Sequence, residues 1–204
     1  MEKATDKPFL TIIDEEVFGP ASMEHSSTDR AADMGQNRAK GYAGAFPGRK
    51  LADAAATDSS YKWAGGGLAS TPSDLARFGA AMLAGELVGG EWQEDMLTAR
   101  TLASGEVNEQ SYGLGWRIGG IEVDGQSGGA KEWTTLIHHG GNTAGSTAIL
   151  LLLPDYDLVV ALTANAIRDD GSGPVTEHAT SILRIFVDYL DESGMGRGRA
   201  GQES

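Results

Sequence analysis

Residues 134–164 read TTLIHHGGNTAGSTAILLLLPDYDLVVALTA, and this stretch decides the fold class. It contains three mainly apolar runs that have the length and composition of strands. These runs are 134–139, 147–153 and 158–164. The separators between them, 140–146 and 154–157, are short and rich in residues that form turns. Because short connections join antiparallel neighbours, the stretch predicts an antiparallel sheet.

Two helices are predicted to cover this sheet. Leu150 to Leu153 shows no alternation of apolar and polar residues, which is typical of a strand that is covered on both faces. Thr71-Pro72-Ser73-Asp74 has the cap, the proline and the acidic residue of a helix start, and Gly85 is expected to end that helix. The last helix is expected from Val175 to Leu190. Its predicted sheet-facing residues are Val175, Ala179, Ile182, Phe186 and Leu190. The predicted fold class is therefore α+β, an antiparallel sheet flanked by helices.

The other segments are predicted from local patterns. Before residue 100 we expect a short amphipathic helix over 9–18, a long surface loop over 21–60 with a strand near 39–45, and a weaker helix over 92–98. After residue 100 we expect an alternating strand over 112–118, followed by a glycine-rich hairpin connection over 119–130 that could contain a short strand at 121–123. We expect residues 1–193 to form one partial domain and residues 194–204 to form a disordered tail.

The composition excludes several classes of function. The chain has no cysteine, which excludes disulfides, thiolate metal sites and a cysteine nucleophile. Its formal net charge of −13 repels phosphate groups, so neither nucleic acid nor an anionic membrane is an expected partner. No apolar stretch follows Met1 to Asp6, so no signal peptide is predicted, and the longest apolar run is too short to span a bilayer. The cellular location stays open.

Two sequence patterns resemble nucleophile motifs, but neither has the expected surroundings. Ser59 and Lys62 match Ser-x-x-Lys, a motif in which the serine opens a helix and the lysine lies one turn later. Here three glycines, Gly65 to Gly67, follow, so we predict a chance match. Ser127 lies in a Gly-x-Ser-x-Gly pattern, which requires a strand before it and a helix after it. A strand is predicted after it instead.

The histidines do not predict a metal site, and no cofactor is expected. The four are His25, His138, His139 and His178, and none has the spacing of metal ligands. Neighbouring residues of a strand point to opposite faces, so His138 and His139 would not share an ion. The segment from His139 to Asn142 ends a predicted strand in glycines, and such an edge can place an imidazole and backbone N–H groups beside a carbonyl. A plain hairpin turn is the alternative.

Several segments together resemble the β-lactamase-related serine hydrolases. This family includes class C β-lactamases, penicillin-binding proteins and DD-peptidases, and the chain is especially similar to its mitochondrial β-lactamase-like branch and the bacterial relatives of that branch. The segments that carry the resemblance occur in the family's order. They are Pro20–Met23, Tyr61–Gly79, Tyr112–Trp116 (YGLGW), His139–Gly145 (HGGNTAG) and the two apolar runs 146–154 and 158–165.

The resemblance implies the C-terminal part of the β-lactamase/transpeptidase-like fold and a position for three site residues. His139 corresponds to the first residue of the family's His-x-Gly element, with a role in hydrogen bonding and in orienting a substrate carboxylate or carbonyl. Gly141 follows, and the N–H of Asn142 corresponds to part of the oxyanion hole. The family's Ser-x-x-Lys and Tyr-x-Asn elements have no match, so the nucleophile is expected to lie upstream of Met1.

Three hypotheses follow. The first is an incomplete serine hydrolase whose intact form attacks an ester, β-lactam or peptide carbonyl through an acyl-enzyme. Its partners would be a small-molecule or peptide substrate and either the missing N-terminal half or a second copy of the chain. The second is a binding or assembly module that kept the fold without the chemistry. The third is a hydrolase that uses Ser127.

Overall fold

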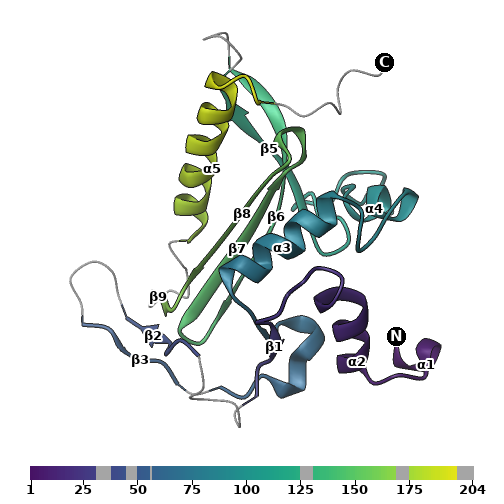
Figure 1. Ribbon diagram of the computed structural model, residues 1–204, viewed down its shortest axis with the longest axis vertical. Coiled ribbons are helices and arrows are strands. Elements are labelled where there is room, and N and C mark those ends of the chain that lie inside the picture. The colour runs from purple at the N-terminus through teal and green to yellow at the C-terminus, as the bar shows by residue number, and fades with distance from the viewer. Residues whose placement is uncertain (31–37, 45–49, 56, 125–130, 169–174, 197–204) are drawn as a thin grey trace. The chain divides into compact units, whose positions relative to one another are not determined.

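The computed structural model describes residues 1–30, 38–44, 50–55, 57–124, 131–168 and 175–196 (Figure 1). Two compact units divide the chain, and each is treated by itself. The first unit comprises residues 1–78, 140–149 and 161–176, and the second comprises residues 79–139, 150–160 and 177–204. In the described ranges, no helix is long and apolar enough to cross a bilayer.

The helices and strands follow the predicted order in outline. The helical elements are α1 (Glu2–Thr5), α2 (Phe9–Ile13), η1 (Asp14–Phe18), η3 (Ser60–Gly65), α3 (Pro72–Leu83), α4 (Glu91–Met96), η4 (Pro154–Tyr156) and α5 (Val175–Glu192). The strands are β1 (Ser27–Thr28), β2 (Tyr42–Ala43), β3 (Ala52–Asp53), β4 (Leu68–Ala69), β5 (Arg117–Val123), β6 (Glu132–Thr143), β7 (Ser146–Leu153), β8 (Leu158–Ala164) and β9 (Ala166–Ile167).

The largest sheet has four strands in the order β5-β6-β7-β8. The β5 and β6 strands pair antiparallel, and two residues, Ala144 and Gly145, join β6 to β7. This confirms the predicted antiparallel sheet flanked by helices. A smaller sheet departs from the pattern, because β2 pairs antiparallel with β3 but parallel with β9. The predicted strand near 39–45 corresponds to β2, whereas β1 and β3 were not predicted in the 21–60 segment.

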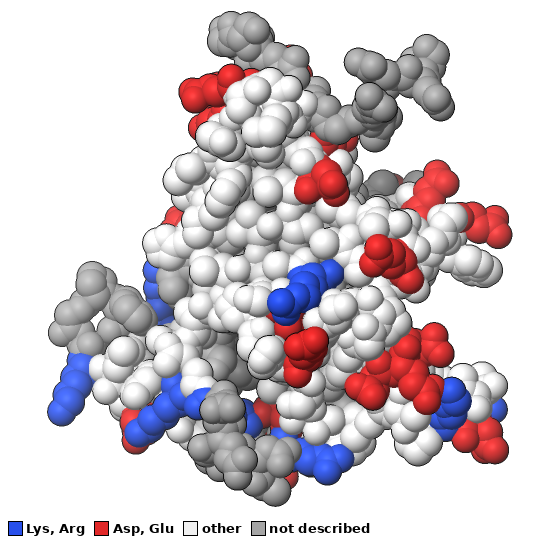
Figure 2. Space-filling view, viewed as in Figure 1, with Lys and Arg blue, Asp and Glu red and all other residues white. Residues whose placement is uncertain are grey.

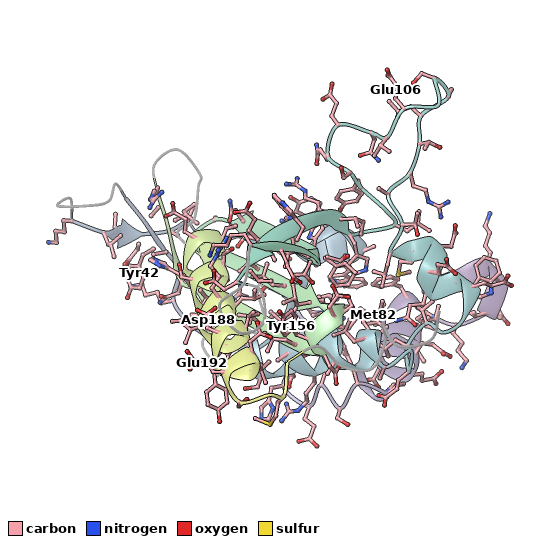
Figure 3. All side chains as sticks on the ribbon, turned by 90° about the horizontal axis from the view of Figure 1, so that it is seen from above. Tyr42, Met82, Glu106, Tyr156, Asp188 and Glu192 are labelled. Atoms are coloured by element: carbon pink, nitrogen blue, oxygen red, sulfur yellow. The ribbon has the colours of Figure 1, made fainter. Side chains whose placement is uncertain are left out.

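The core of the second unit lies on both faces of β7, as the absence of alternation predicted. Leu150 to Leu153 are all buried. On one face, Gly79 of α3 comes so close to Val159 and Leu150 that an added Cβ would lie 2.6 Å from a Val159 methyl carbon. The close approach of α3 to the sheet therefore depends on the glycine at position 79, which has no side chain. After the strand, the hydroxyl of Tyr156 (labelled in Figure 3) donates to Asp191 of α5, and the two oxygen atoms are 3.1 Å apart.

The α5 helix buries a different set of residues from the one predicted. Ala179, Leu183 and Val187, spaced four residues apart, are completely buried. The predicted face was wrong at Phe186, which is half exposed, and it did not include Leu183. The reason is that α5 has apolar residues over more than half of its circumference, so the sequence pattern alone could not show which stripe meets the sheet.

Two boundaries in the predicted sheet were also wrong. Tyr112 to Trp116 is a tight turn and not a strand, because Gly115 has a φ of 86° and the Gly113 N–H donates to the Trp116 carbonyl across 2.7 Å. The strand begins at Arg117 and includes Gly119 and Gly120, which were predicted to lie in a hairpin connection. At the other boundary, β6 continues to Thr143, so Gly140 to Asn142 lie inside a strand.

In the first unit, a buried carboxylate connects the start of α3 to the segment before β1. Asp74 is completely buried and accepts hydrogen bonds from the His25 N–H at 2.7 Å, the Ser26 hydroxyl at 2.8 Å and Arg77 at 2.7 Å. The Asp74 N–H donates to the Thr71 hydroxyl, which confirms the predicted cap. Every partner is a hydrogen-bond donor, so the ionised form of Asp74 is the one that fits.

Candidate functional site

His139 lies in β6 with its imidazole against the ring of Tyr112. The two ring centroids are 5.9 Å apart and the planes are inclined at 75°, an edge-to-face contact. The imidazole is still accessible to solvent. Tyr112 is held in place by Asn108, whose side chain accepts from the Tyr112 N–H at 2.8 Å and donates to the Tyr112 carbonyl at 2.9 Å. The position of the aromatic wall beside His139 therefore depends on a hydrogen-bonded loop.

A cationic side chain lies on the neighbouring strand. Arg117 of β5 is the register partner of His138, so these two side chains share one face of the sheet, while His139 points to the other face. The Arg117 guanidinium donates to the Gln110 side chain across 2.8 Å. Sequence reasoning missed Arg117, Tyr112 and Asn108 as site residues. The YGLGW match was the only signal that pointed towards them.

Both histidines favour the neutral form. Partial burial lowers the pKa of His139, and the positive charge of Arg117 lowers it further. Burial also lowers the pKa of His138, with contributions from Arg117 and from His139. A neutral imidazole carries one N–H donor and one bare nitrogen acceptor. His139 can therefore donate a hydrogen bond to a substrate oxygen or accept a proton near neutral pH.

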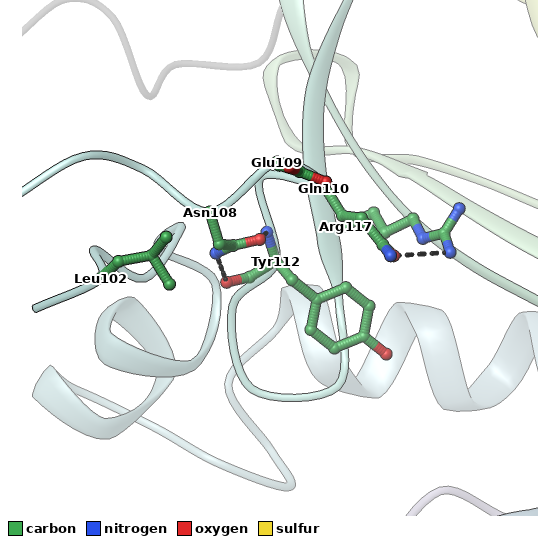
Figure 4. A pocket seen from close by; sticks show the side chains of 6 residues that line it. All are labelled: Leu102, Asn108, Glu109, Gln110, Tyr112 and Arg117. Atoms are coloured by element: carbon green, nitrogen blue, oxygen red, sulfur yellow. Dashed lines mark hydrogen bonds between the residues drawn. The ribbon is translucent and has the colours of Figure 1, made fainter. Parts of the chain in front are cut away.

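An open hollow of about 590 Å³ adjoins this group (Figure 4). Its lining consists of Leu102, Asn108, Glu109, Gln110, Tyr112 and Arg117. Figure 4 shows the Tyr112 ring and the Arg117 guanidinium projecting from the same loop-and-strand junction. The hollow thus combines an apolar wall, amide groups and a cation, a mixture that suits a small polar ligand with an anionic group.

Gly141 and Asn142 lie farther along β6, and both are exposed. A Cβ added at Gly141 would meet nothing within 4 Å, so its lack of a side chain leaves open space at this point of the strand. In contrast, a Cβ at Gly140 would lie 2.8 Å from the Ile149 side chain, so that glycine is required for packing. The three residues predicted to form the site, His139, Gly141 and Asn142, therefore lie within one strand, β6, and not at a strand end followed by a turn.

The first serine pattern lacks the geometry of a nucleophile. Ser59 is buried, and the segment after it, η3, is a 3₁₀ helix in which Lys62 has a non-helical φ of −132°. The Lys62 N–H donates to the Ser59 carbonyl, and the Lys62 ammonium lies over the Tyr61 ring. The regular helical turn that Ser-x-x-Lys chemistry needs is not formed here. Ser127 lies outside the described residues.

The described residues contain no group of three or more histidine or acidic side chains that could hold a metal ion. His25 lies at the Asp74 network, with its Nδ1 atom 4.0 Å from an Asp74 carboxylate oxygen, and His178 is exposed on α5.

A family model described as Beta-lactamase matches residues 1–182. The chain belongs to the β-lactamase family. Among curated proteins, this β-lactamase-family chain is similar to the mitochondrial serine β-lactamase-like protein LACTB. It is 32% identical to the Bos taurus protein and 30% identical to the Homo sapiens protein over 123 residues, which cover 52% of this chain and 22% of each relative.

Solved structures show the same fold. The penicillin-binding protein from Bacillus halodurans has a TM-score of 0.65 at 20% identity, covering 91% of this chain and 52% of the other. The D-amino acid amidase from Ochrobactrum anthropi has a TM-score of 0.63 at 18% identity, and the match covers 95% of this chain and 54% of the amidase. This β-lactamase-family chain therefore spans about half the length of the solved structures and 22% of the curated relatives.

Proposed function

We propose that this chain is the C-terminal portion of a serine hydrolase that acts on an ester, β-lactam or peptide carbonyl. In that reaction a serine oxygen attacks the carbonyl carbon, the alcohol or amine leaves with a proton, and water then releases the acyl group from the serine. The observation that carries the proposal is the neutral-favouring His139 imidazole beside Tyr112, in a chain of the β-lactamase family. The serine itself is proposed to come from outside these 204 residues.

His139 is proposed to donate a hydrogen bond to the substrate or to the catalytic network. Arg117, whose side chain lies on the other face of the sheet but whose charge acts on His139, is proposed to attract an anionic substrate group electrostatically. The backbone N–H of Asn142 is proposed to support the developing negative charge on the carbonyl oxygen. Under this assignment the isolated chain binds substrate analogues weakly and does not hydrolyse them, because an oxyanion element cannot replace the nucleophile and its base.

Labelling with a fluorophosphonate, which modifies activated serines, tests the absence of a nucleophile. We expect no labelling of the isolated chain. If labelling occurs and vanishes in Ser127→Ala but persists in Ser59→Ala, the chain is instead a hydrolase that uses Ser127. Loss of labelling in Ser59→Ala alone would show that the Ser-x-x-Lys pattern is active despite its buried serine.

NMR titration with penicillin G, which has both a β-lactam carbonyl and a carboxylate, tests the site. We expect chemical-shift changes at His139 and Tyr112, and we expect the affinity to fall about tenfold in Arg117→Gln, which corresponds to the loss of one charge-assisted contact of about 1.4 kcal/mol. Arg77→Gln is the matched control, since that arginine belongs to the Asp74 network. Shift changes that avoid His139 would refute the assignment.

A binding module that kept the fold without the chemistry is the second candidate. The observation that favours it is the hollow beside Tyr112, which is lined by six residues without a serine. Binding of penicillin G at this hollow, together with a failure of every upstream or partner polypeptide to confer fluorophosphonate labelling, would favour this candidate over the hydrolase.

A further inference from the structure

A second hollow of the second unit is bordered by α5 and by the outer strand β5. Its volume is about 430 Å³. The lining residues are Gly120, Ile121 and Glu122 of β5, Trp133 and Leu136 of β6, and Thr180 and Arg184 of α5. The hollow beside Tyr112 has an entirely different lining. The second hollow is therefore a separate place of the same unit, and the proposed hydrolysis does not use it.

The strand side of this hollow is mainly apolar. Because β5 is an outer strand of the sheet, residues that point to either face can border a hollow at this edge. Ile121 is buried and Leu136 is half-buried. The Trp133 ring is 69% exposed and lies over Gly120, where an added Cβ would be 2.8 Å from a ring carbon. The missing side chain at position 120 therefore leaves room for the indole at the edge of the hollow.

Two opposite charges border the same hollow from different elements. Glu122 belongs to β5 and Arg184 to α5, and both side chains are exposed. Within the part of the chain that the structure describes, neither has an ion-pair partner within 4.0 Å, so they do not pair with each other either. A cation and an anion that are both unpaired beside an apolar lining suit a ligand that carries both charges and an apolar group.

The surroundings disfavour a ligand with a negative charge alone. The chain has a formal net charge of −13, and Asp188, Asp191 and Glu192 follow Arg184 on α5. Figure 2 shows acidic side chains at the end of α5 that is uppermost in Figure 1. An anion would meet Arg184 but would be repelled by Glu122 and by this acidic end, and a cation would be repelled by Arg184. A zwitterion meets an opposite charge on each side.

We propose that this hollow binds a free α-amino acid with an apolar side chain. The Arg184 guanidinium binds the carboxylate, Glu122 binds the ammonium group, and the side chain lies against Ile121 and Leu136. A free amino acid fits because both of its charges are attached to one carbon atom, whereas a residue inside a peptide has neither charge. Binding here does not involve His139 or a nucleophilic serine, so the site stands or falls independently of the hydrolase assignment.

NMR titration of the full chain with L-leucine and three of its analogues tests the site. We expect saturable shift changes at the amides of Gly120, Leu136 and Thr180. The analogue 4-methylpentanoate lacks the ammonium group and 3-methylbutylamine lacks the carboxylate, so each should bind at least tenfold more weakly. Alanine, which lacks most of the apolar side chain, should also bind at least tenfold more weakly.

Three results of this titration would overturn the proposal. One is the absence of saturable changes with leucine up to about 50 mM. Another is an equal affinity for leucine and for either analogue with a single charge. The third is a set of shift changes centred on Tyr112, which would place the binding in the other hollow.

Charge-removing variants assign the two contacts. Arg184→Gln and Glu122→Gln should each lower the affinity for leucine at least tenfold, while Glu91→Gln, which removes an exposed charge from α4, should leave it within twofold. Arg184→Gln should not weaken the binding of 3-methylbutylamine, because that analogue has no carboxylate. Retained leucine affinity in Arg184→Gln or Glu122→Gln, or an equal loss in Glu91→Gln, would overturn the assignment. The analogue series uses the unaltered chain, so it decides the proposal even where a variant fails to fold.

Discussion

The ring of Tyr112 meets the imidazole of His139 edge to face, with 5.9 Å between the centroids. One residue comes from a tight turn that Gly113 and Gly115 make possible, and the other from the middle of the long strand β6. Because the Tyr112 ring lies against the imidazole, we expect it to contribute to the partial burial that lowers the pKa of His139. A change in the turn that holds Tyr112 is therefore expected to change the pKa of His139.

Removing the Tyr112 ring should return the pKa of His139 towards its ordinary value. We expect Tyr112→Ala to raise the pKa of His139 towards the usual value of about 6.5, because water regains access to the charged form. Tyr112→Phe should leave the pKa unchanged, since the edge-to-face contact needs only the ring. NMR titration of the His139 ring protons measures both. Equal shifts in the two variants would show that the hydroxyl and not the ring is responsible.

Neutralising Arg117 should raise the pKa of both histidines of β6. The guanidinium lowers the pKa of His138 and of His139, so Arg117→Gln is expected to shift both upwards in the same NMR experiment. The sign carries over to stability. A histidine whose pKa is lower in the folded state than in the unfolded state binds its proton more readily when the protein is unfolded. The protein therefore loses stability as the pH falls from about 6.5, the ordinary pKa of histidine, through the lower pKa of the folded state. That loss should be smaller in Arg117→Gln.

The Asp74 network predicts a second acid-dependent loss of stability. Burial by itself raises the pKa of Asp74, but the hydrogen bonds from Ser26, from the His25 N–H and from Arg77 outweigh it and lower the pKa overall. Asp74 therefore stabilises the folded protein above about pH 3.9, and this stabilisation is lost as the pH falls through the lower pKa that Asp74 has in the folded state. Asp74→Asn should lower the free energy of unfolding by about 2–4 kcal/mol at neutral pH. It should also weaken the loss of stability at acidic pH, and urea unfolding at several pH values measures both effects.

A control for that variant lies in the same unit. Asp53 forms an exposed ion pair with Lys40 across 2.7 Å, and Asp53→Asn should cost less than about 1 kcal/mol. If both variants lose the same stability, the buried network is not responsible.

Gly145 should tolerate no side chain. Its φ is 79°, and a Cβ there would lie 2.8 Å from the Gly41 carbonyl carbon and from the Tyr42 nitrogen. Gly145→Ala is therefore expected to lower the free energy of unfolding by about 2–4 kcal/mol, from backbone strain and from steric overlap together. Gly141→Ala, where nothing lies within 4 Å, should change it by less than about 0.5 kcal/mol. Similar losses at both positions would contradict the described turn.

The buried and the exposed apolar residues of α5 should differ in their effect on the stability of the isolated chain. Leu183→Ala removes a completely buried side chain and should cost about 2–5 kcal/mol, while Ile185→Ala removes an exposed one and should cost less than about 0.5 kcal/mol. Thermal unfolding of the two variants measures the difference. A large loss in Ile185→Ala would mean that this side chain is covered in solution, for example by self-association.

Sequence reasoning predicted the parts of the fold that local patterns specify. The apolar runs gave β7 and β8 almost to the residue, and the cap at Thr71 and the proline at 72 placed the start of α3. The misses have a common physical cause. Gly119, Gly120 and Gly140 to Asn142 read as turns, yet they lie in strands because cross-strand pairing outweighs their weak intrinsic preference.

The candidate site was predictable only in part. His139 was proposed as a site residue from the family resemblance. Its neighbours Tyr112 and Arg117 could not be proposed in that way, because they lie more than 20 positions away and are brought to it by the turn and by the pairing of β5 with β6. The prediction of a disordered tail from 194 stays open, since residues 197–204 lie outside the described part of the chain.

The contacts around β2 have a consequence for how the chain is made. The Asn165 side chain donates to the Lys40 carbonyl, 125 positions earlier, and the Tyr42 N–H donates to the Asn165 carbonyl. At a synthesis rate of about 5–20 residues per second, the segment around residue 40 leaves the ribosome roughly 6–25 s before the residue that holds it exists. During that interval the Lys40 carbonyl and the Tyr42 N–H lack the hydrogen bonds that Asn165 provides. The synthesis of β8 and β9, on either side of Asn165, therefore determines when the segment around residue 40 can form all of its native hydrogen bonds.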